Sequence, residues 1–213
     1  MTVLEEISEY LQKGRAPLVR DKVKAALDEG ISPKDILENG LLAGMGVVGE
    51  KFKNGELFVP EVMIAARAMN MGVGVLKPYL AGDGIGSKGT VVIGTVRGDQ
   101  HDIGKNLVKL MMEGQGLKVI DLGTDVSPEA FVDAATENEA SVICCSALLT
   151  TTMEEMRNVV ECAKEKGIRD KVFIMVGGAP VTQEFCDEIG ADCYTADAAS
   201  AAEAAASYCR RSD

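Results

Sequence analysis

The residues most able to do chemistry lie together in the stretch 97-RGDQHDIG-104, which holds His101, the only histidine of the chain. Asp99 precedes it by two positions and Gly104 follows it by three. A lone histidine can be a satisfied structural side chain, a general base or a metal ligand. No Ser or Cys nucleophile and no arginine cluster for a substrate stands beside it, which argues against a general base.

The neighbouring carboxylate favours the metal-ligand interpretation of His101. A ligating imidazole usually donates its second N–H to a carboxylate, which sets the tautomer and raises the basicity of the ring. Asp99 is placed to accept that hydrogen bond. One histidine cannot close a metal site made of protein alone, but it can supply an axial ligand to a metal held by a macrocycle, as in haem.

The stretch belongs to a region that alternates apolar strands with helices. The predicted strands cover about 90–96, 117–121, 141–145, 172–176 and, more weakly, 192–195. The predicted helices cover about 103–114, 128–138, 153–166, 181–189 and 198–211. Near-continuous apolar strands that alternate with helices indicate a parallel sheet covered on both faces. Five such units predict a five-stranded, doubly wound α/β domain of the Rossmann or flavodoxin-like type.

Ligands of such sheets bind where the strands end. The expected strand ends are 97-RGDQHDIG-104, 146-SALLTTT-152, 177-GGAP-180 and 194-YTADAAS-200. They bring a histidine, an aspartate, several hydroxyls and a glycine pair to one edge. Small residues dominate there, so the backbone can approach a large ligand closely.

The first part of the chain reads as four helices: about 3–13, about 16–29, Ser32-Pro33 to about Lys53, and one that opens at Pro60. Short connections between them predict a small antiparallel bundle. The expected organisation is a helical cap domain over 1–80, a glycine-rich linker over 81–89, and the α/β domain over 90–213. The linker precedes a strand, so its glycines are not a dinucleotide fingerprint, which must follow one.

Composition excludes several other classes of protein. The net charge is −11, and residues 89–213 carry 11 Lys and Arg against 21 Asp and Glu. An acidic chain with no Trp is a poor nucleic-acid binder. No bilayer-spanning run or signal peptide is expected, which places the protein in the cytoplasm without a membrane partner. The six cysteines form no CxxC pair and are expected to be reduced, acting as small apolar residues.

Together these pieces resemble a known family. Asp99, His101 and Gly104, followed by 146-SAL-148 and 177-GG-178, resemble the DxHxxG…SxL…GG signature of cobalamin-binding domains. The stretch 47-VVGEKFKNGELFVPEV-62 is similar to the helical cap before that domain in cobalamin-dependent methionine synthase and in the corrinoid proteins of methylotrophic methyltransferase systems. The resemblance covers roughly residues 15–210.

The resemblance implies a corrinoid whose own lower base is displaced, with His101 as the axial ligand of cobalt. Asp99 matches the carboxylate behind that histidine, and Thr152 matches a hydroxyl that completes the relay. Residues that match the lining of the displaced nucleotide tail are Ser146, Leu148, Thr150, Gly177, Gly178 and Ala198.

Further contacts to the corrinoid are implied on both sides of the ring. From the cap, Glu38 matches a residue near the corrin edge, and Phe52 and Val59 match residues that cover its upper, methyl-bearing face. The remaining expected contacts from the α/β domain are Gly98, Gln100, Asp102, Ile103, Gly104 and Tyr194. No catalytic residue is implied on this chain, which resembles a cofactor-carrying component of a larger methyltransferase and not a complete enzyme.

The implied cofactor is cobalamin, as methylcobalamin, cob(I)alamin or a related corrinoid containing cobalt. The implied function is that of a methyl carrier from a methylamine, methanol, a betaine or an aryl methyl ether to tetrahydrofolate or coenzyme M. The implied partners are a substrate-specific methyltransferase, a second methyltransferase and a corrinoid-reactivating protein. Two alternatives are a cobalamin-based sensor, which would need a DNA-binding module, and the small subunit of an adenosylcobalamin mutase, which would not need this cap.

Overall fold

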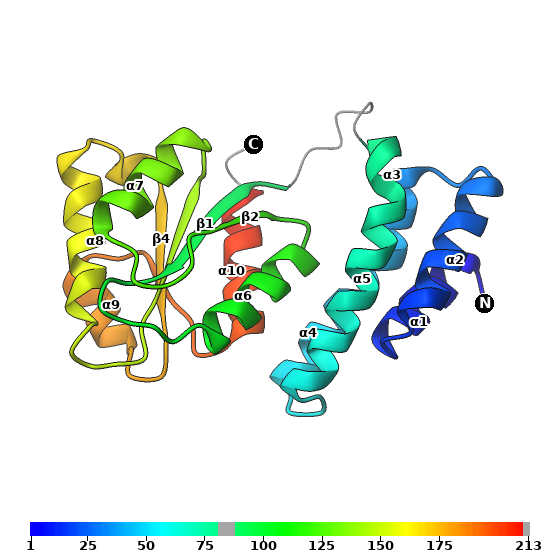
Figure 1. The fold of residues 1–213 in the computed structure, drawn as a ribbon, viewed down its shortest axis with the longest axis horizontal. Coiled ribbons are helices and arrows are strands. Elements are labelled where there is room, and N and C mark those ends of the chain that lie inside the picture. The colour runs from blue at the N-terminus through cyan, green and yellow to red at the C-terminus, as the bar shows by residue number, and fades with distance from the viewer. Residues whose placement is uncertain (81–87, 211–213) are drawn as a thin grey trace. The chain divides into compact units, whose positions relative to one another are not determined.

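The computed structural model describes residues 1–80 and 88–210 of the chain (Figure 1). Contacts between residues divide the chain into two compact units, Met1–Gly86 and Ser87–Asp213. The predicted linker over 81–89 lies outside the described residues except for its last two positions, Lys88 and Gly89. Each unit buries apolar side chains of its own.

The described part of the first unit consists of helices and their turns. They are α1 (Val3–Gln12), α2 (Ala16–Asp28), α3 (Pro33–Asp35), the π-helix η1 (Ile36–Leu42), α4 (Ala43–Lys53) and α5 (Val59–Leu80). Their starts carry the expected local signals. Thr2 and Glu5 form a reciprocal capping box at α1, and the Ser32 hydroxyl accepts the backbone N–H of Asp35 at the start of α3.

The helix predicted from Ser32-Pro33 to Lys53 is one helical run with an irregular middle. The backbone passes from α3 through η1 into α4 without a break. The Asn39-Gly40 pair inside η1 has low helix propensity. Gly40 also packs against α1, where an added Cβ would approach the Ile7 side chain to 3.2 Å. The helical run therefore has the predicted bounds, and its middle is a π-helix.

Helix α5 departs from the expectation that no stretch is long and apolar enough to cross a bilayer. By length and composition alone, its window Val59–Leu76 qualifies, with a hydropathy of 1.2. The apolar stripe of this helix includes Val62, Ala66 and Met69, all buried in the first unit. Of the window, 39% is buried within the structure. A core helix of a helical bundle passes the same test, so this single helix is weak evidence for a membrane span.

The second unit contains one parallel five-stranded sheet with the order β2-β1-β3-β4-β5. Its strands are β1 (Thr90–Thr95), β2 (Lys118–Asp121), β3 (Val142–Ser146), β4 (Phe173–Gly177) and β5 (Cys193–Tyr194). This is the flavodoxin-like order, in which the chain reverses direction across the sheet between β1 and β3. The predicted strands match the observed strands in number and direction, and no strand boundary differs by more than one residue.

Helices cover both faces of the sheet (Figure 1). They are α6 (Ile103–Gly114), α7 (Pro128–Glu137), α8 (Glu154–Glu165), α9 (Gln183–Ile189) and α10 (Ala198–Cys209), with a short 3-10 turn η2 at Arg169–Lys171. Helices α6 and α10 pack together, as do α7 and α8. Under α7, Phe131 fills the space beside Gly94 of β1, where an added Cβ would come within 2.8 Å of its ring.

The cysteines of the second unit behave as apolar core residues. All six are free thiols; five are buried, and Cys193 is half-buried. Burial raises the pKa of the Cys145 thiol to about 12 and that of Cys186 to about 11. These thiols therefore stay protonated at neutral pH, which makes them poor nucleophiles and poor metal ligands.

Candidate functional site

The loop after β1 forms the centre of the candidate site at the carboxyl edge of the sheet. Gly98 has a left-handed φ of 81°, and the backbone N–H of Asp99 donates back to the Val96 carbonyl over 3.1 Å. This tight turn buries Asp99 and leaves His101 half exposed at the carboxyl edge of the sheet. Because β1 lies where the strand order reverses, the loop borders the crevice in which such sheets bind ligands.

Asp99 is fully buried and accepts five hydrogen bonds. Its Oδ1 accepts the backbone N–H of His101 at 3.0 Å and faces His101 Nδ1 at 2.7 Å. Its Oδ2 accepts the backbone N–H groups of Leu148 at 2.8 Å and Leu149 at 3.2 Å, and the Thr152 hydroxyl at 2.9 Å. The carboxylate thus ties the loop after β1 to the loop after β3.

Two opposing effects act on the charge of Asp99. Burial on its own would raise the pKa of this carboxyl group, but hydrogen bonds from His101, Leu148 and Thr152 outweigh it and hold the pKa well below its usual range. Asp99 is therefore ionised at neutral pH. An ionised carboxylate can only accept hydrogen bonds, so the proton between Asp99 and His101 resides on Nδ1.

The imidazole of His101 is consequently oriented with its other nitrogen free. With the proton on Nδ1, Nε2 of the neutral ring carries a lone pair. Among the described residues Nε2 has no hydrogen-bond partner, and the side chain is 50% exposed. The backbone carbonyl of His101 is held by the Thr95 hydroxyl at 2.8 Å. This arrangement presents the lone pair of Nε2, in a fixed orientation, to a group outside the protein.

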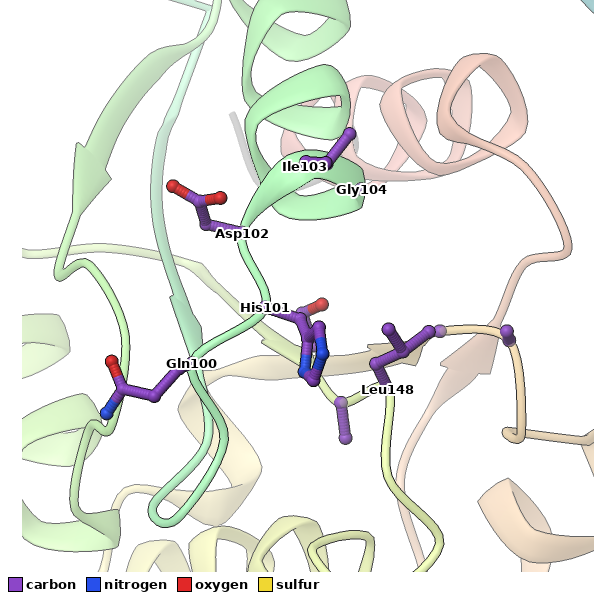
Figure 2. A pocket seen from close by; sticks show the side chains of 10 residues that line it. Gln100, His101, Asp102, Ile103, Gly104 and Leu148 are labelled. Carbon is purple, nitrogen blue, oxygen red and sulfur yellow. The ribbon is translucent and has the colours of Figure 1, made fainter.

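His101 lines a cavity of about 430 Å³, a volume typical of ligand pockets. Figure 2 shows His101 and Leu148 facing it from two different loops, while Gln100 points away from Leu148. Its lining is mostly small or apolar and consists of Gln100, His101, Asp102, Ile103, Gly104, Ser146, Ala147, Leu148, Gly178 and Ala179.

The structure brings together only part of the predicted site. Asp99, His101 and Thr152 are hydrogen-bonded in series. Seven other predicted residues line the cavity: Gln100, Asp102, Ile103, Gly104, Ser146, Leu148 and Gly178. Asp99 and Thr152 do not line the cavity themselves, and neither do the predicted positions Gly98, Thr150, Gly177, Tyr194 and Ala198.

The predicted contacts from the cap lie in the first unit. Glu38 is exposed in η1, Phe52 is half-buried on α4, and Val59 is the half-buried first residue of α5. Their approach to a corrinoid remains a prediction.

Several lining and supporting residues were not predicted. Ala147 and Ala179 line the cavity; the only signal for them was their place inside the quoted 146-SAL-148 and 177-GGAP-180. Lys105 is 2% exposed, and its ammonium group donates to Asp121 Oδ1 and Asn106 Oδ1, each over 2.7 Å. Nothing in its neighbourhood in the sequence distinguishes Lys105 from a surface lysine of an amphipathic helix.

Comparisons with known proteins show to which family the chain belongs. Two families, each described as a B12 binding domain, match residues 89–206 and 3–77. A corrinoid protein of Desulfitobacterium hafniense is 44% identical, covering 96% of each chain. Dimethylamine corrinoid protein 1 of Methanosarcina mazei is 46% identical, covering 94% of this chain and 95% of its own.

A solved structure matches the chain over nearly its whole length. The methanol:cobalamin methyltransferase complex of Methanosarcina barkeri contains a chain with a TM-score of 0.88 and 33% identity. The match covers 97% of this chain and 79% of that one.

The residues at the carboxyl edge fit a corrinoid. His101 offers one free nitrogen, as a macrocycle-bound metal with one open axial position requires. Around it, Ile103 is 78% exposed and Leu148 is 44% exposed, which supplies apolar surface for a flat ring. Gly104 leaves space, because an added Cβ would have no atom of the described chain within 4 Å. The chain belongs to the family of B12-binding corrinoid proteins, and its cofactor is cobalamin or a related corrinoid.

Proposed function

We propose that the protein is a methyl carrier that holds its corrinoid with the lower base displaced and with His101 Nε2 as the axial cobalt ligand. The observation that carries this proposal is the hydrogen-bonded series from Thr152 through Asp99 to His101 Nδ1, which leaves Nε2 free beside the cavity. When bound, the corrinoid would supply a cobalt atom that accepts and releases a methyl group.

The residues of the chain then have defined tasks. His101 would bind the cobalt of the corrinoid through Nε2. Asp99 holds the proton at Nδ1 and so keeps the ring in the ligating tautomer. Thr152 donates to the second oxygen of Asp99 and stabilises its charge. The lining residues Ser146, Leu148 and Gly178 would accommodate the displaced nucleotide tail. The cap residues Glu38, Phe52 and Val59 would shield the upper face from water.

The chain would act between two partner enzymes in the cytoplasm. A substrate-specific methyltransferase would load the methyl group, and a second one would pass it to tetrahydrofolate or coenzyme M, with a corrinoid-reactivating protein as a third partner. A methylamine is the first donor to test, since a dimethylamine corrinoid protein shares 46% identity against 33% for the chain in the methanol complex. The match over residues 3–77 favours this function over a mutase subunit, which would not need the cap.

An absorption spectrum of the protein mixed with hydroxocobalamin tests the role of His101. The wild type is expected to give an imidazole-ligated spectrum with the lower base displaced, and His101→Ala a spectrum without that ligand, because the chain has no other histidine. Free imidazole added to His101→Ala should restore the ligated spectrum by filling the vacated volume.

The outcomes separate the parts of the proposal. If wild type and His101→Ala give the same spectrum, His101 is not the ligand. If the wild type retains no corrinoid, the whole proposal fails. If the ligand is confirmed, transfer of a labelled methyl group from methylamines, methanol and betaines is measured with candidate partner methyltransferases. Absence of transfer with every partner would overturn the carrier function while leaving corrinoid binding intact.

Gly104→Ala is expected to weaken corrinoid binding without harming the fold. In the free protein the added methyl group meets open space, and alanine favours a helix over glycine by about 0.5–1 kcal/mol. In the complex the methyl group would intrude on the cavity, and we expect affinity to fall about tenfold, or 1.4 kcal/mol. Spectral titration with hydroxocobalamin and urea unfolding measure the two quantities.

Gly74→Ala provides the matched control for this substitution. Gly74 is an exposed glycine of α5, and its Cβ would likewise have no described atom within 4 Å. It should gain similar stability and keep the affinity of the wild type. Equal affinities of Gly104→Ala and Gly74→Ala would contradict the expected close approach of the corrinoid to Gly104.

A further inference from the structure

The pairing of β1 with the segment after β2 contains an irregularity beside the site. The backbone N–H of Thr95 donates to the Gly123 carbonyl at 2.9 Å, and the Thr95 carbonyl accepts the N–H of Val126 at 3.0 Å. In a regular parallel ladder those two partner residues would be two positions apart, whereas here they are three apart. One extra residue is therefore accommodated, which is a β-bulge, and bulges next to sites redirect side chains.

Asp125 occupies this bulge in a left-handed conformation, with φ of 55°. Only two described residues other than glycine have positive φ, Asp125 and Glu139. This conformation is costly for most side chains, although Asp and Asn tolerate it best. Asp125 is also exposed, so the burial of an apolar side chain does not explain its position.

Asp125 forms hydrogen bonds with the backbone of both Gly98 and Asp99. Its Oδ1 accepts the backbone N–H of Gly98 at 2.7 Å, and its own backbone N–H donates to the Asp99 carbonyl at 3.0 Å. The neighbouring Thr124 hydroxyl donates to Gln100 Oε1 at 3.1 Å. The bulge therefore fixes the backbone of the loop on the side opposite to the contacts that Asp99 makes with Leu148 and Thr152.

We propose that Asp125 is a positioning residue, which sets the orientation and tautomer of His101 through the backbone of Asp99. The proposal rests on the role proposed above for His101. The Asp99 side chain can meet His101 Nδ1 at 2.7 Å only if its own backbone is held in place. Asp125 supplies two of the hydrogen bonds that hold the backbone of this loop. The left-handed backbone of Asp125 directs both hydrogen bonds toward the loop.

The single histidine makes this inference directly measurable in the protein without cofactor. Nitrogen-15 NMR of histidine-labelled apoprotein reports the Nδ1–H and Nε2–H tautomers of His101 alone. The wild type is expected to show mainly the Nδ1–H form. In Asp125→Gly the left-handed backbone is retained and the carboxylate is lost. We expect the ratio of Nε2–H to Nδ1–H to rise about fivefold, the factor that corresponds to one net hydrogen bond.

Conservative and control variants separate positioning from stability. Asp125→Asn keeps both the acceptor oxygen and tolerance of the left-handed conformation, so it should retain the wild-type tautomer ratio. Glu139→Gly changes the other left-handed residue, in the turn before the amino end of β3, and should also leave the ratio unchanged. Asp125→Ala loses the acceptor and strains the backbone, so its shift should be at least that of Asp125→Gly.

The result that overturns the inference is a wild-type tautomer ratio in Asp125→Gly, even if its resistance to urea falls, because a merely structural residue would change stability alone. A shifted ratio in Glu139→Gly would overturn it as well, since the effect would not be specific to the bulge. Failure of His101 as cobalt ligand is distinguished by the hydroxocobalamin spectrum of the wild type, which does not involve Asp125.

Discussion

Asp99→Ala is expected to lower the free energy of unfolding by about 3–5 kcal/mol, because several buried donors lose their acceptor at once. The backbone N–H groups of Leu148 and Leu149, the Thr152 hydroxyl and the His101 ring all donate to this carboxylate. Asp99 is fully buried and Thr152 is 7% exposed, whereas the His101 side chain is half exposed. Urea unfolding followed by circular dichroism measures the loss.

The same substitution should also release the histidine. Without Asp99, no carboxylate holds the proton on Nδ1, so the tautomer with a free Nε2 is less populated. The imidazole-ligated spectrum with hydroxocobalamin is expected to weaken in Asp99→Ala. Asp99→Asn keeps the volume and one acceptor oxygen, but its NH₂ group faces donors on the other side, so we expect a smaller loss of about 1–3 kcal/mol.

Asp133→Asn serves as the control for removal of a carboxylate. Asp133 lies on the surface of α7 and pairs with Lys166, with its side chain 55% exposed. An exposed pair of this kind contributes about 0–1 kcal/mol, so the variant should unfold close to the wild type and keep its corrinoid spectrum. If Asp99→Ala were as stable as Asp133→Asn, the hydrogen-bonded cluster around Asp99 would not be a major source of stability.

Acidification provides a second measure of the Asp99 contribution. Because its pKa is held below the ordinary value, its stabilisation is fully present above the pKa of the unfolded chain, near about 3.9. The stabilisation is lost as the pH falls below that value, when the unfolded state binds the proton more readily. The stability of Asp99→Asn should therefore fall less steeply than that of the wild type between about pH 5 and pH 2.

Gly178→Ala is expected to be destabilising by about 3–5 kcal/mol and to distort the cavity. An added Cβ would lie 1.8 Å from the Ala147 carbonyl oxygen, and the φ of Gly178 is 138°, which side chains rarely adopt. Relief of the clash requires the loops after β3 and β4 to separate, and both loops line the cavity. Corrinoid affinity should therefore fall together with stability.

Gly177→Ala tests whether the effect belongs to Gly178 alone. At Gly177 the nearest described atom to an added Cβ is the Thr195 carbonyl oxygen at 3.7 Å, an ordinary contact, and its backbone is not left-handed. We expect Gly177→Ala to cost less than about 1 kcal/mol. Urea unfolding of the two alanine variants checks the difference, and similar midpoints for both would contradict the expected backbone clash.

Local sequence signals predicted most elements of the fold. Apolar runs of strand length, separated by helical stretches, located the strands and helices of the second unit, and Ser or Pro residues marked the starts of helices in the first, because these signals depend only on nearby residues. Those signals do not distinguish an α-helix from a π-helix. Ile36–Leu42 forms a π-helix, and Gly40 within it lies against Ile7 of another helix.

Some residues of the candidate site were predictable from the sequence, and others were not. His101, Asp99 and the small residues at the strand ends follow from residue types and from the rule that parallel strands end at one edge. The pairing of Asp99 with Thr152 was expected only from the family resemblance, since 53 positions separate them. Lys105, buried against Asp121, and Ala179 at the cavity carry no periodic signal that marks them.

The sequence by itself determined the alternation of strands and helices, the edge at which a ligand binds and the single histidine available to a metal. Only the tertiary structure decided which nitrogen of that histidine is free, how Asp99 meets Leu148 and Thr152, and that a bulge turns Asp125 toward the loop. The physical reason is the range of the forces involved. Periodicity and capping act within a few residues, whereas hydrogen bonds between loops depend on strand register and backbone conformation.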